Sequence, residues 1–358
     1  MKRVLVANRG EIAVRIIEAC RSCGVETVAV YSQADESSSH VWMADQAVRI
    51  GRPPASESYL CVNKLLHVAL ETGCDGLHPG YGFLSERSGF VDQCTAEGIT
   101  FIGPAADHIR LMGDKAEARR TVTALGVPVV PGSEGAFSDI DEAYAVVQDI
   151  GFPLLIKARS GGGGRGMRVV EDISQFRSLF AQARSEAEAA FGDGELYLER
   201  YFQRIRHIEV QVFGDRHGNV SHLGERDCTL QRRHQKLLEE TPSTVIDDSK
   251  RDSICNAAVA ITRGINYEGA GTVEFIYDDL SGEFFFIEMN TRIHDEHPSS
   301  LVVSGLDLVV VQVIVAAGDP LSFAGKNPDR EGHAIEFRIN AEDPARDFLP
   351  SPGILKRW

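Results

Sequence analysis

The chain has 358 residues, ordinary globular fractions of apolar and charged residues, and a formal net charge of −15. This length can bury a large core in two or three domains. The acidic balance argues against nucleic acid and anionic membranes as main partners. No apolar run is long enough to span a bilayer, and no secretory leader pattern opens the chain. The seven scattered cysteines fit a reducing compartment, so we expect a cytoplasmic protein.

The first hundred residues alternate between strand-like and helix-like patterns. Residues 4–7 predict a strand, residues 11–23 an amphipathic helix and residues 25–31 a second strand. Such alternation predicts a doubly wound parallel sheet, in which ligands bind at loops following the strands. Residues 8–10 and 78–82 are loops of this kind. The dinucleotide glycine fingerprint is absent from the first turn, so the fold alone does not indicate NAD.

A proline-rich segment interrupts this alternation, and we place a domain boundary near residue 130. Farther on, the glycine-rich residues 161–166 join two apolar strands, which is unlike a Walker-type loop that opens a helix. Free backbone N–H groups in such a loop can surround phosphate oxygens, and Lys157 adds a positive charge. We expect a lid that becomes ordered over a nucleotide; the alternative is a disordered hairpin tip.

Two β-rich runs, residues 271–276 and 283–290, flank a turn and predict an antiparallel hairpin. Side chains alternate along a strand, so Glu274 and Glu288 can lie opposite or diagonal on one face, with Asn290 beside them. Like charges placed this way repel unless a cation lies between them. Their hard oxygen donors suit Mg²⁺. The alternative is a solvated sheet face with scattered charges.

Residues 294–297 read His-Asp-Glu-His and could suggest zinc. We do not favour zinc, because neighbouring side chains on an extended segment point to opposite faces. Residues 225–236 combine both signs of charge with little periodicity. They form either an exposed surface loop or a site for a small anion, and the density of bidentate-capable groups favours the site.

Several short segments, spread over nearly the whole chain, have the pattern of one family. They are residues 7–13, 78–86, 112–115, 161–166, 225–229, 231–236, 288–293, 338–343 and 348–353. On these segments the sequence resembles the biotin carboxylase subunit or domain of biotin-dependent carboxylases such as acetyl-CoA carboxylase, within the ATP-grasp superfamily.

This resemblance implies an α/β fold with a Rossmann-like N-terminal domain, an ATP-grasp domain and a truncated C-terminal domain. The implied boundaries are 1–113 for the first domain, 114–325 for the ATP-grasp domain with its lid at 130–203, and 326–358 for the incomplete third. The sequence stops at Trp358, so we expect either a fragment of a longer protein or a divergent one.

The resemblance also implies a reaction. Bicarbonate attacks the γ-phosphate of ATP to give carboxyphosphate, which then carboxylates biotin on a carrier protein. The implied cofactors are ATP and Mg²⁺ or Mn²⁺, with carrier-bound biotin as substrate. The implied partners are a biotin carboxyl carrier protein, a carboxyltransferase and bicarbonate, with a homodimer if the C-terminal domain is present.

The resemblance assigns roles to individual residues. Glu296 would be the general base toward bicarbonate, Arg338 would steady the biotin enolate, and Lys236 and Arg292 would balance charge on the phosphoryl group. The implied metal ligands are Glu274, Glu288 and Asn290. The implied ATP-binding residues are Lys115, Lys157, Gly163, Gly164, Gly166, Glu199, Tyr201, His207, Gln231 and His234.

The sequence departs from the family at two neighbouring positions. The family has Gln-Val before the general base, whereas this chain has His294 and Asp295. We expect Asp295 to compete for Arg292 and to weaken anion binding. Two alternatives therefore stay open: a divergent ATP-grasp carboxylate–amine ligase, and a non-catalytic ATP-binding homologue.

Overall fold

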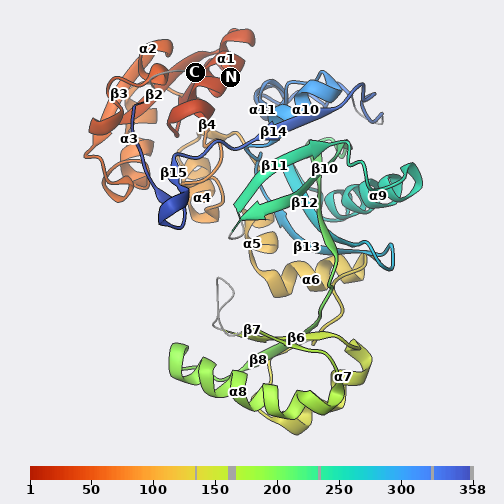
Figure 1. The fold of residues 1–358 in the computed structure, drawn as a ribbon. Coiled ribbons are helices and arrows are strands. Elements are labelled where there is room, and N and C mark those ends of the chain that lie inside the picture. Colours follow the sequence, from red (N-terminus) through yellow and green to blue (C-terminus); the bar gives the residue numbers. More distant parts are fainter. Residues whose placement is uncertain (134, 160–166, 233–234, 324–325, 355–358) are drawn as a thin grey trace. The chain divides into compact units, whose positions relative to one another are not determined.

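The computed structural model describes residues 1–133, 135–159, 167–232, 235–323 and 326–354. These residues form two compact units, each of which mixes helices with a sheet (Figure 1). The first unit comprises Met1–Leu125, His207–Phe275 and Glu288–Trp358; the second comprises Gly126–Arg206 and Ile276–Ile287.

The N-terminal part of the first unit is a parallel sheet with strand order β3-β2-β1-β4-β5, which confirms the predicted doubly wound arrangement. Its central strand is completely buried at Val4, Leu5 and Val6, as a parallel strand covered on both faces requires. The strands are β1 (Arg3–Val6), β2 (Glu26–Ser32), β3 (Gln46–Gly51), β4 (Gly76–His78) and β5 (Thr100–Phe101).

Helices follow these strands at the spacing that the sequence predicts. Their apolar faces form two buried cores with residues of the parallel sheet. The helices are α1 (Gly10–Ser22), α2 (Ser39–Met43), α3 (Val62–Glu71), α4 (Ser88–Ala96), α5 (Ala106–Gly113) and α6 (Lys115–Ala124), with short 3-10 turns η1 (Gln33–Asp35) and η2 (Ala55–Glu57).

The loops at the carboxyl ends of β1 and β4 are joined directly. Because Val6 pairs with His78 in neighbouring strands, the loops that follow them start side by side. Asn8 Nδ2 donates to the carbonyl oxygens of Pro79 at 2.7 Å and Tyr81 at 2.8 Å. Asn8 thus fixes the second loop, which leads on to Glu86.

A second sheet has the strand order β13-β12-β9-β10-β11-β14 (Figure 1). Its pairs β9–β10, β10–β11 and β11–β14 are antiparallel. The strands are β9 (Ile205–Gly214), β10 (Val220–Arg232), β11 (Gln235–Thr241), β12 (Gly269–Asp278), β13 (Phe284–Asn290) and β14 (Ala334–Phe337).

Helices α9 (Asp248–Gly264), α10 (His297–Ser304) and α11 (Leu308–Ala316) accompany this sheet. Among the described residues no single helix is long and apolar enough to cross a membrane; α10 and α11 meet that criterion only together, with a bend of 94° between them. Beyond β14 lie β15 (Glu342–Asp343), η3 (Pro344–Arg346) and β16 (Leu349–Pro350).

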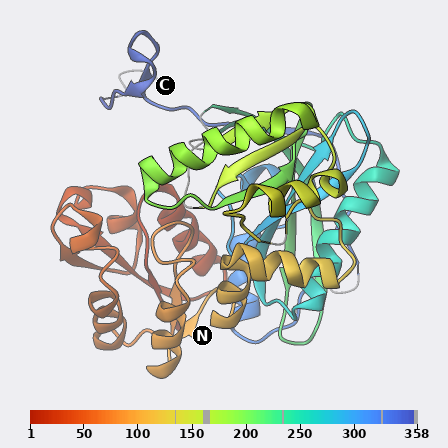
Figure 2. The same cartoon turned by 90° about the horizontal axis from the view of Figure 1, so that it is seen from below.

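The second unit contains a three-stranded antiparallel sheet of order β7-β6-β8. Helices α7 and α8 lie on the same face of it (Figure 2). Leu154, Ile156, Leu196 and Leu198, at alternate strand positions, are completely buried there. The elements are α7 (Ile140–Ile150), β6 (Leu154–Ala158), β7 (Met167–Val170), α8 (Ile173–Phe191) and β8 (Leu196–Arg200). The glycine-rich residues 160–166, which prompted the lid hypothesis, lie outside the described residues.

Candidate functional site

Strand β9 carries a polar side chain at every second position: His207, Glu209 and Gln211. On an antiparallel strand this alternation usually marks a face in contact with water. Here Glu209 and Gln211 are completely buried, as are the apolar residues between them. The polar face of β9 therefore lies inside the unit, and its charges need partners from neighbouring elements.

Arg226 on β10 is the direct partner of Glu209. The two residues are opposite each other in the β9–β10 register, and both are completely buried. Arg226 Nε donates to Glu209 Oε1 at 2.5 Å, while its Nη1 donates to Gln211 at 3.1 Å and to Ser300 Oγ at 2.8 Å. Burial alone would raise the pKa of Glu209, but Arg226 and Lys236 outweigh it and hold that pKa well below its usual range.

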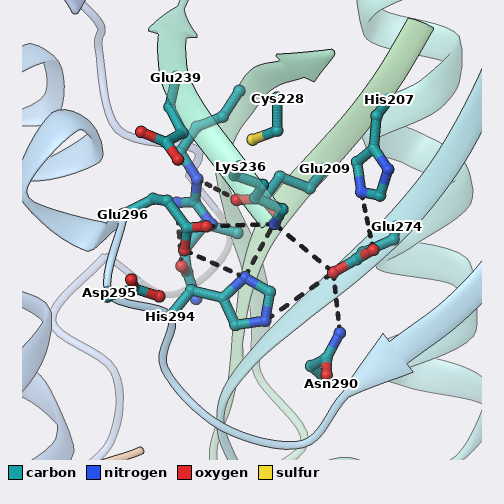
Figure 3. Close-up of polar contacts among 12 residues, drawn as sticks. His207, Glu209, Cys228, Lys236, Glu239, Glu274, Asn290, His294, Asp295 and Glu296 are labelled. Carbon is teal, nitrogen blue, oxygen red and sulfur yellow. Dashed lines mark hydrogen bonds and ion pairs between the residues drawn. The ribbon is translucent and has the colours of Figure 1, made fainter. Parts of the chain in front are cut away.

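Lys236 on β11 lies among three carboxylates (Figure 3). Its Nζ is 2.5 Å from Glu209 Oε2, 3.3 Å from Glu296 Oε1 and 3.7 Å from Glu274 Oε1. Burial lowers the pKa of Lys236, yet the surrounding carboxylates raise it above its ordinary value overall. We call Lys236 with Glu209, Glu274 and Glu296 the Lys236 cluster; its ammonium group is permanently charged at neutral pH.

The three residues expected to bind a metal come from the neighbouring strands β12 and β13, and one of them, Glu274, belongs to the Lys236 cluster. Glu274 on β12 accepts a 2.9 Å hydrogen bond from Asn290 Nδ2 on the neighbouring β13. The other Glu274 oxygen is 2.7 Å from His207 Nε2. Glu288, two residues before Asn290, has its Oε2 3.3 Å from Lys115 Nζ. Two carboxylates and a free amide oxygen are a donor set that fits Mg²⁺.

His207 and Glu274 affect each other's protonation. Burial lowers the pKa of His207, but Glu274 raises it above its ordinary value overall. Burial conversely raises the pKa of Glu274, and the His207 contact reverses that shift, so the Glu274 pKa is lowered. Glu274 therefore stays ionised, as a metal ligand must.

After β13, residues 295–296 form a turn and α10 begins at His297. His294 Nδ1 lies 3.2 Å from Glu209 Oε2 and 3.4 Å from Glu296 Oε2 (Figure 3). His294 and Glu296 are two positions apart, and alternation along an extended segment also places such residues on one side. His294 Nε2 is 3.9 Å from Glu274 Oε1. His294 thus lies between all three carboxylates of the cluster.

Arg338, just after β14, pairs with acidic residues from two other segments. Its Nη2 is 2.7 Å from Asp295 Oδ2 and 2.7 Å from Glu296 Oε1, and its Nε is 3.5 Å from Glu239 Oε1. The expectation that Asp295 competes for Arg292 is wrong in this structure. Arg292 Nε instead donates to Glu86 Oε2 at 2.8 Å, in the loop that Asn8 helps to fix.

The two carboxylate oxygens of Glu296 differ in their hydrogen bonding. Its Oε1 accepts from Arg338, whereas its Oε2 has no hydrogen-bond partner among the described residues although the side chain is nearly fully buried. Burial and Glu209 raise the pKa of Glu296, but His294, Lys236 and Arg226 outweigh them and lower it. The open oxygen is thus an ionised proton acceptor inside the unit.

The remaining predicted ATP residues lie elsewhere. Gln231 on β10 is paired with Lys236 in the β10–β11 register, and its Nε2 donates to the Cys228 carbonyl oxygen at 2.9 Å. In the second unit, Lys157 forms an ion pair with Glu199, and the Tyr201 N–H donates to the Pro153 carbonyl oxygen at 2.8 Å. Gly163, Gly164, Gly166 and His234 lie outside the described residues.

Reasoning from the sequence missed several charged residues of this site: Glu209, Arg226, Glu239 and Glu86. The sequence does contain a signal for Glu209, because polar residues alternate with Ile and Val along residues 207–212. That signal does not tell a buried polar face from a solvated one. Only the partners on β10, β11 and β12 make the distinction.

Comparisons with known proteins show the family of this chain. Residues 1–109 match the biotin carboxylase N-terminal domain, and residues 114–324 match the ATP-binding domain of the carbamoyl-phosphate synthase L chain. Biotin carboxylase 1 of Bacillus subtilis is 49% identical over 100% of this chain and 80% of its own length. The chain belongs to the biotin carboxylase family. Biotin carboxylase of Nostoc sp. is similar to the same extent, 50% identical over 99% of this chain and 79% of its own.

Solved biotin carboxylase structures show the same fold. The biotin carboxylase domain of Hydrogenobacter thermophilus 2-oxoglutarate carboxylase, in complex with MgADP, ADP and bicarbonate, has a TM-score of 0.85 at 47% identity, covering 98% of this chain and 77% of that one. The Campylobacter jejuni biotin carboxylase structure has a TM-score of 0.87 at 46% identity, covering 98% and 78%. The ATP-grasp fold class is therefore confirmed, and this family of ATP-dependent ligases is favoured over the amine-ligase and non-catalytic alternatives.

Proposed function

We propose that this chain catalyses ATP- and bicarbonate-dependent carboxylation of biotin, with carboxyphosphate as the intermediate. The observation that carries the proposal is the buried Lys236 cluster, in which Glu296 also contacts Arg338, in a chain 49% identical to a biotin carboxylase. The cluster supplies a proton acceptor and fixed cations within a few ångströms of each other. Both are needed when bicarbonate, an anion, attacks a triphosphate.

Glu296 is proposed as the base that takes the bicarbonate proton. Its free Oε2 can accept that proton without breaking an existing hydrogen bond. Lys236 Nζ, 3.3 Å from the other Glu296 oxygen, is placed to balance charge on the phosphoryl group. Arg292, oriented by Glu86, is proposed as a second cation, and Arg338 as the donor to the biotin enolate.

Glu274, Glu288 and Asn290 are proposed to hold Mg²⁺ or Mn²⁺. A divalent ion held there would neutralise phosphate charge. For ATP itself, we propose Lys115, Lys157, Glu199, Tyr201, His207 and Gln231. Gly163, Gly164, Gly166 and His234 remain part of this proposal, as do the domain boundaries 1–113, 114–325 with lid 130–203, and 326–358.

The proposed partners are a biotin carboxyl carrier protein and a carboxyltransferase. The proposed assembly is a homodimer if the C-terminal domain is present, and the proposed location is the cytoplasm. Relatives include a pyruvate carboxylase subunit and methylcrotonoyl-CoA carboxylase subunits. These relatives are named after different carboxylated substrates although their sequences are similar to this chain. We therefore propose that the final carboxyl acceptor is determined outside this chain. Acetyl-CoA and fatty acid biosynthesis are one proposed setting.

The test is ADP release with and without bicarbonate, and with and without free biotin. We expect bicarbonate to raise ADP release, and biotin to raise it further. In Glu296→Gln the bicarbonate-dependent part should fall by about 100-fold or more, as expected for loss of a general base. Exposed Glu18→Gln on α1 is the matched control. ADP release that ignores bicarbonate in the unaltered chain would overturn the proposal.

A further inference from the structure

The Arg338 guanidinium is already occupied by carboxylates of the chain. Its Nη2 is equally close, at 2.7 Å, to Asp295 Oδ2 and Glu296 Oε1, and Glu239 Oε1 lies 3.5 Å from its Nε. One nitrogen thus bridges two negative charges. Charge-assisted bonds of this kind are the strong ones, so a third anion can reach Nη2 only if one carboxylate moves away.

The three carboxylates differ in how easily they can move. The side chains of Glu239 and Glu296 are 0% and 2% exposed, whereas that of Asp295 is 37% exposed. Glu296 has Lys236 and His294 as further partners. For Asp295, Arg338 is the single ion-pair partner within the part of the chain that the structure describes. Asp295 is therefore the carboxylate that an incoming anion would displace.

We propose that Asp295 is a positioning residue that occupies Arg338 in place of an anionic substrate group and thereby sets the affinity of this site for small oxyanions. The proposal rests on the proposed function, in which Arg338 donates to the biotin enolate. It extends that role to bicarbonate, because Glu296, the proposed base toward bicarbonate, shares the same Arg338 nitrogen. Each binding event then exchanges one carboxylate for another oxyanion on the same nitrogen. The free energy of oxyanion binding is therefore less favourable, because the Asp295–Arg338 contact is lost when the anion binds.

Asp295 also affects Glu296 through the shared nitrogen. With Asp295 in place, Nη2 donates a hydrogen bond to Glu296 and also forms an ion pair with Asp295. Without Asp295, Arg338 has a free donor direction, and the site loses one negative charge. The main consequence is tighter oxyanion binding rather than a faster chemical step, because Glu296 keeps its open Oε2.

The kinetic test compares the unaltered chain with Asp295→Ala and Asp295→Asn in bicarbonate-dependent ADP release. We expect the KM for bicarbonate to fall by about three- to tenfold in Asp295→Ala, and less in Asp295→Asn, whose amide oxygen can stay beside Arg338 as an acceptor. The kcat should change by less than about twofold. An unchanged or higher KM in Asp295→Ala would overturn the proposal. Asp92→Asn, at the exposed Arg110–Asp92 pair, is the matched control.

A second measurement does not depend on turnover. Phenylglyoxal reacts with accessible arginines, and mass spectrometry of the peptide containing Arg338 gives its rate of modification. We expect Arg338 to react at least about threefold faster in Asp295→Ala, because the contact with the more exposed carboxylate is gone, while Arg110 reacts at an unchanged rate. Equal Arg338 rates would overturn the positioning role. No bicarbonate dependence in the unaltered chain would instead overturn the proposed function and leave the labelling result to decide the role of Asp295.

Discussion

The two acidic residues proposed to bind the metal differ in how far their side chains are exposed to solvent. Glu274 is 6% exposed and is held by Asn290 and His207. Glu288 has a 36% exposed side chain, and its partner Lys115 is 84% exposed. Removing the charge of Glu274 would therefore disturb the buried cluster, whereas the charge of Glu288 can be removed with little effect on folding.

Glu288→Gln therefore tests the metal role without a strong effect on stability. The change keeps the shape of the side chain and removes its charge. ATP turnover should fall by at least about tenfold, and the Mg²⁺ concentration for half-maximal rate should rise, because a neutral amide is a weaker ligand for a hard cation. Steady-state rates over a Mg²⁺ titration measure both quantities.

The matched control is Glu117→Gln on α6, an exposed glutamate paired with Arg120. It removes the same charge from another surface ion pair. An unchanged Mg²⁺ dependence in Glu288→Gln, with folding intact by circular dichroism, would exclude Glu288 as a metal ligand.

At the scale of helices and strands, periodicity predicted most of what forms locally. The helix expected at 11–23 is α1 (Gly10–Ser22), and the strand expected at 25–31 is β2 (Glu26–Ser32). Their apolar spacing is a property of the segment itself. The charged segment 225–236, for which an exposed loop was one alternative, is mostly strand: β10 runs to Arg232 and β11 begins at Gln235.

What could not be predicted depends on contacts between distant residues. The turn after β13 is held where the Thr291 N–H donates to Glu86 Oε1 at 3.1 Å, and these residues are 205 positions apart. Asp295 contacts Arg338 because β14, which ends just before Arg338, pairs with β11. Local sequence gives the residue types of such a site, but the partner of each charge follows from the sheet order β9-β10-β11-β14.

Helix α11 offers a test of local stabilisation by its N-cap. Asp307 accepts hydrogen bonds from the N–H groups of Val309 and Val310, both at 3.1 Å, and pairs with Arg15 of α1. Asp307→Ala should lower the free energy of unfolding by about 1 kcal/mol, which corresponds to a decrease in Tm of about 1–2 °C for a chain of this length. Asp307→Asn keeps an acceptor and should lose less. Thermal unfolding followed by circular dichroism measures both.

The pH dependence of this effect follows from the pKa of Asp307. Burial raises that pKa, but the Arg15 and Val310 hydrogen bonds lower it below the ordinary value of 3.8. Its stabilising contribution is thus fully present above the unfolded-state pKa and is lost only as the pH falls through the lower folded-state value. The Asp307→Ala difference should be the same at pH 5 and pH 8, and a marked difference between these two pH values would contradict this assignment.

Across the whole molecule, burial lowers the pKa of several histidines and raises the pKa of two glutamates. Burial lowers the pKa of His78 to about 3 and those of His222 and His297 to about 4. Between these values and 6.5 the unfolded chain binds protons that the folded chain does not, so the histidines destabilise the fold as the pH falls. Burial and the nearby Glu296 raise the pKa of Glu239 and of Glu336 to about 7.

Glu239 and Glu336 therefore change the stability of the fold with pH in the opposite direction to the histidines. They face each other in the β11–β14 register, a placement that is unfavourable when both are charged. Their folded-state pKa lies above the unfolded value of 4.5. The stability they contribute is fully present below pH 4.5 and is lost as the pH rises through about 7. Near pH 7 the three histidines are neutral in both the folded and the unfolded state and contribute little, whereas ionisation of the two glutamates destabilises the fold.

Glu239→Gln separates these opposing contributions. Glu239 is completely buried, and neither of its oxygens has a hydrogen-bond partner among the described residues. An amide at this position does not ionise, so the variant avoids the cost of a buried charge at high pH. Relative to the unaltered chain, its free energy of urea unfolding should be higher at pH 8 than at pH 5 by up to about 3 kcal/mol, the equivalent of a pKa displaced from 4.5 to about 7. Exposed Glu18→Gln should show no such difference between the two pH values. If Glu239→Gln were instead less stable at pH 8 than at pH 5 relative to the unaltered chain, Glu239 would be a stabilising anion held by Arg338, and its pKa would be lowered rather than raised.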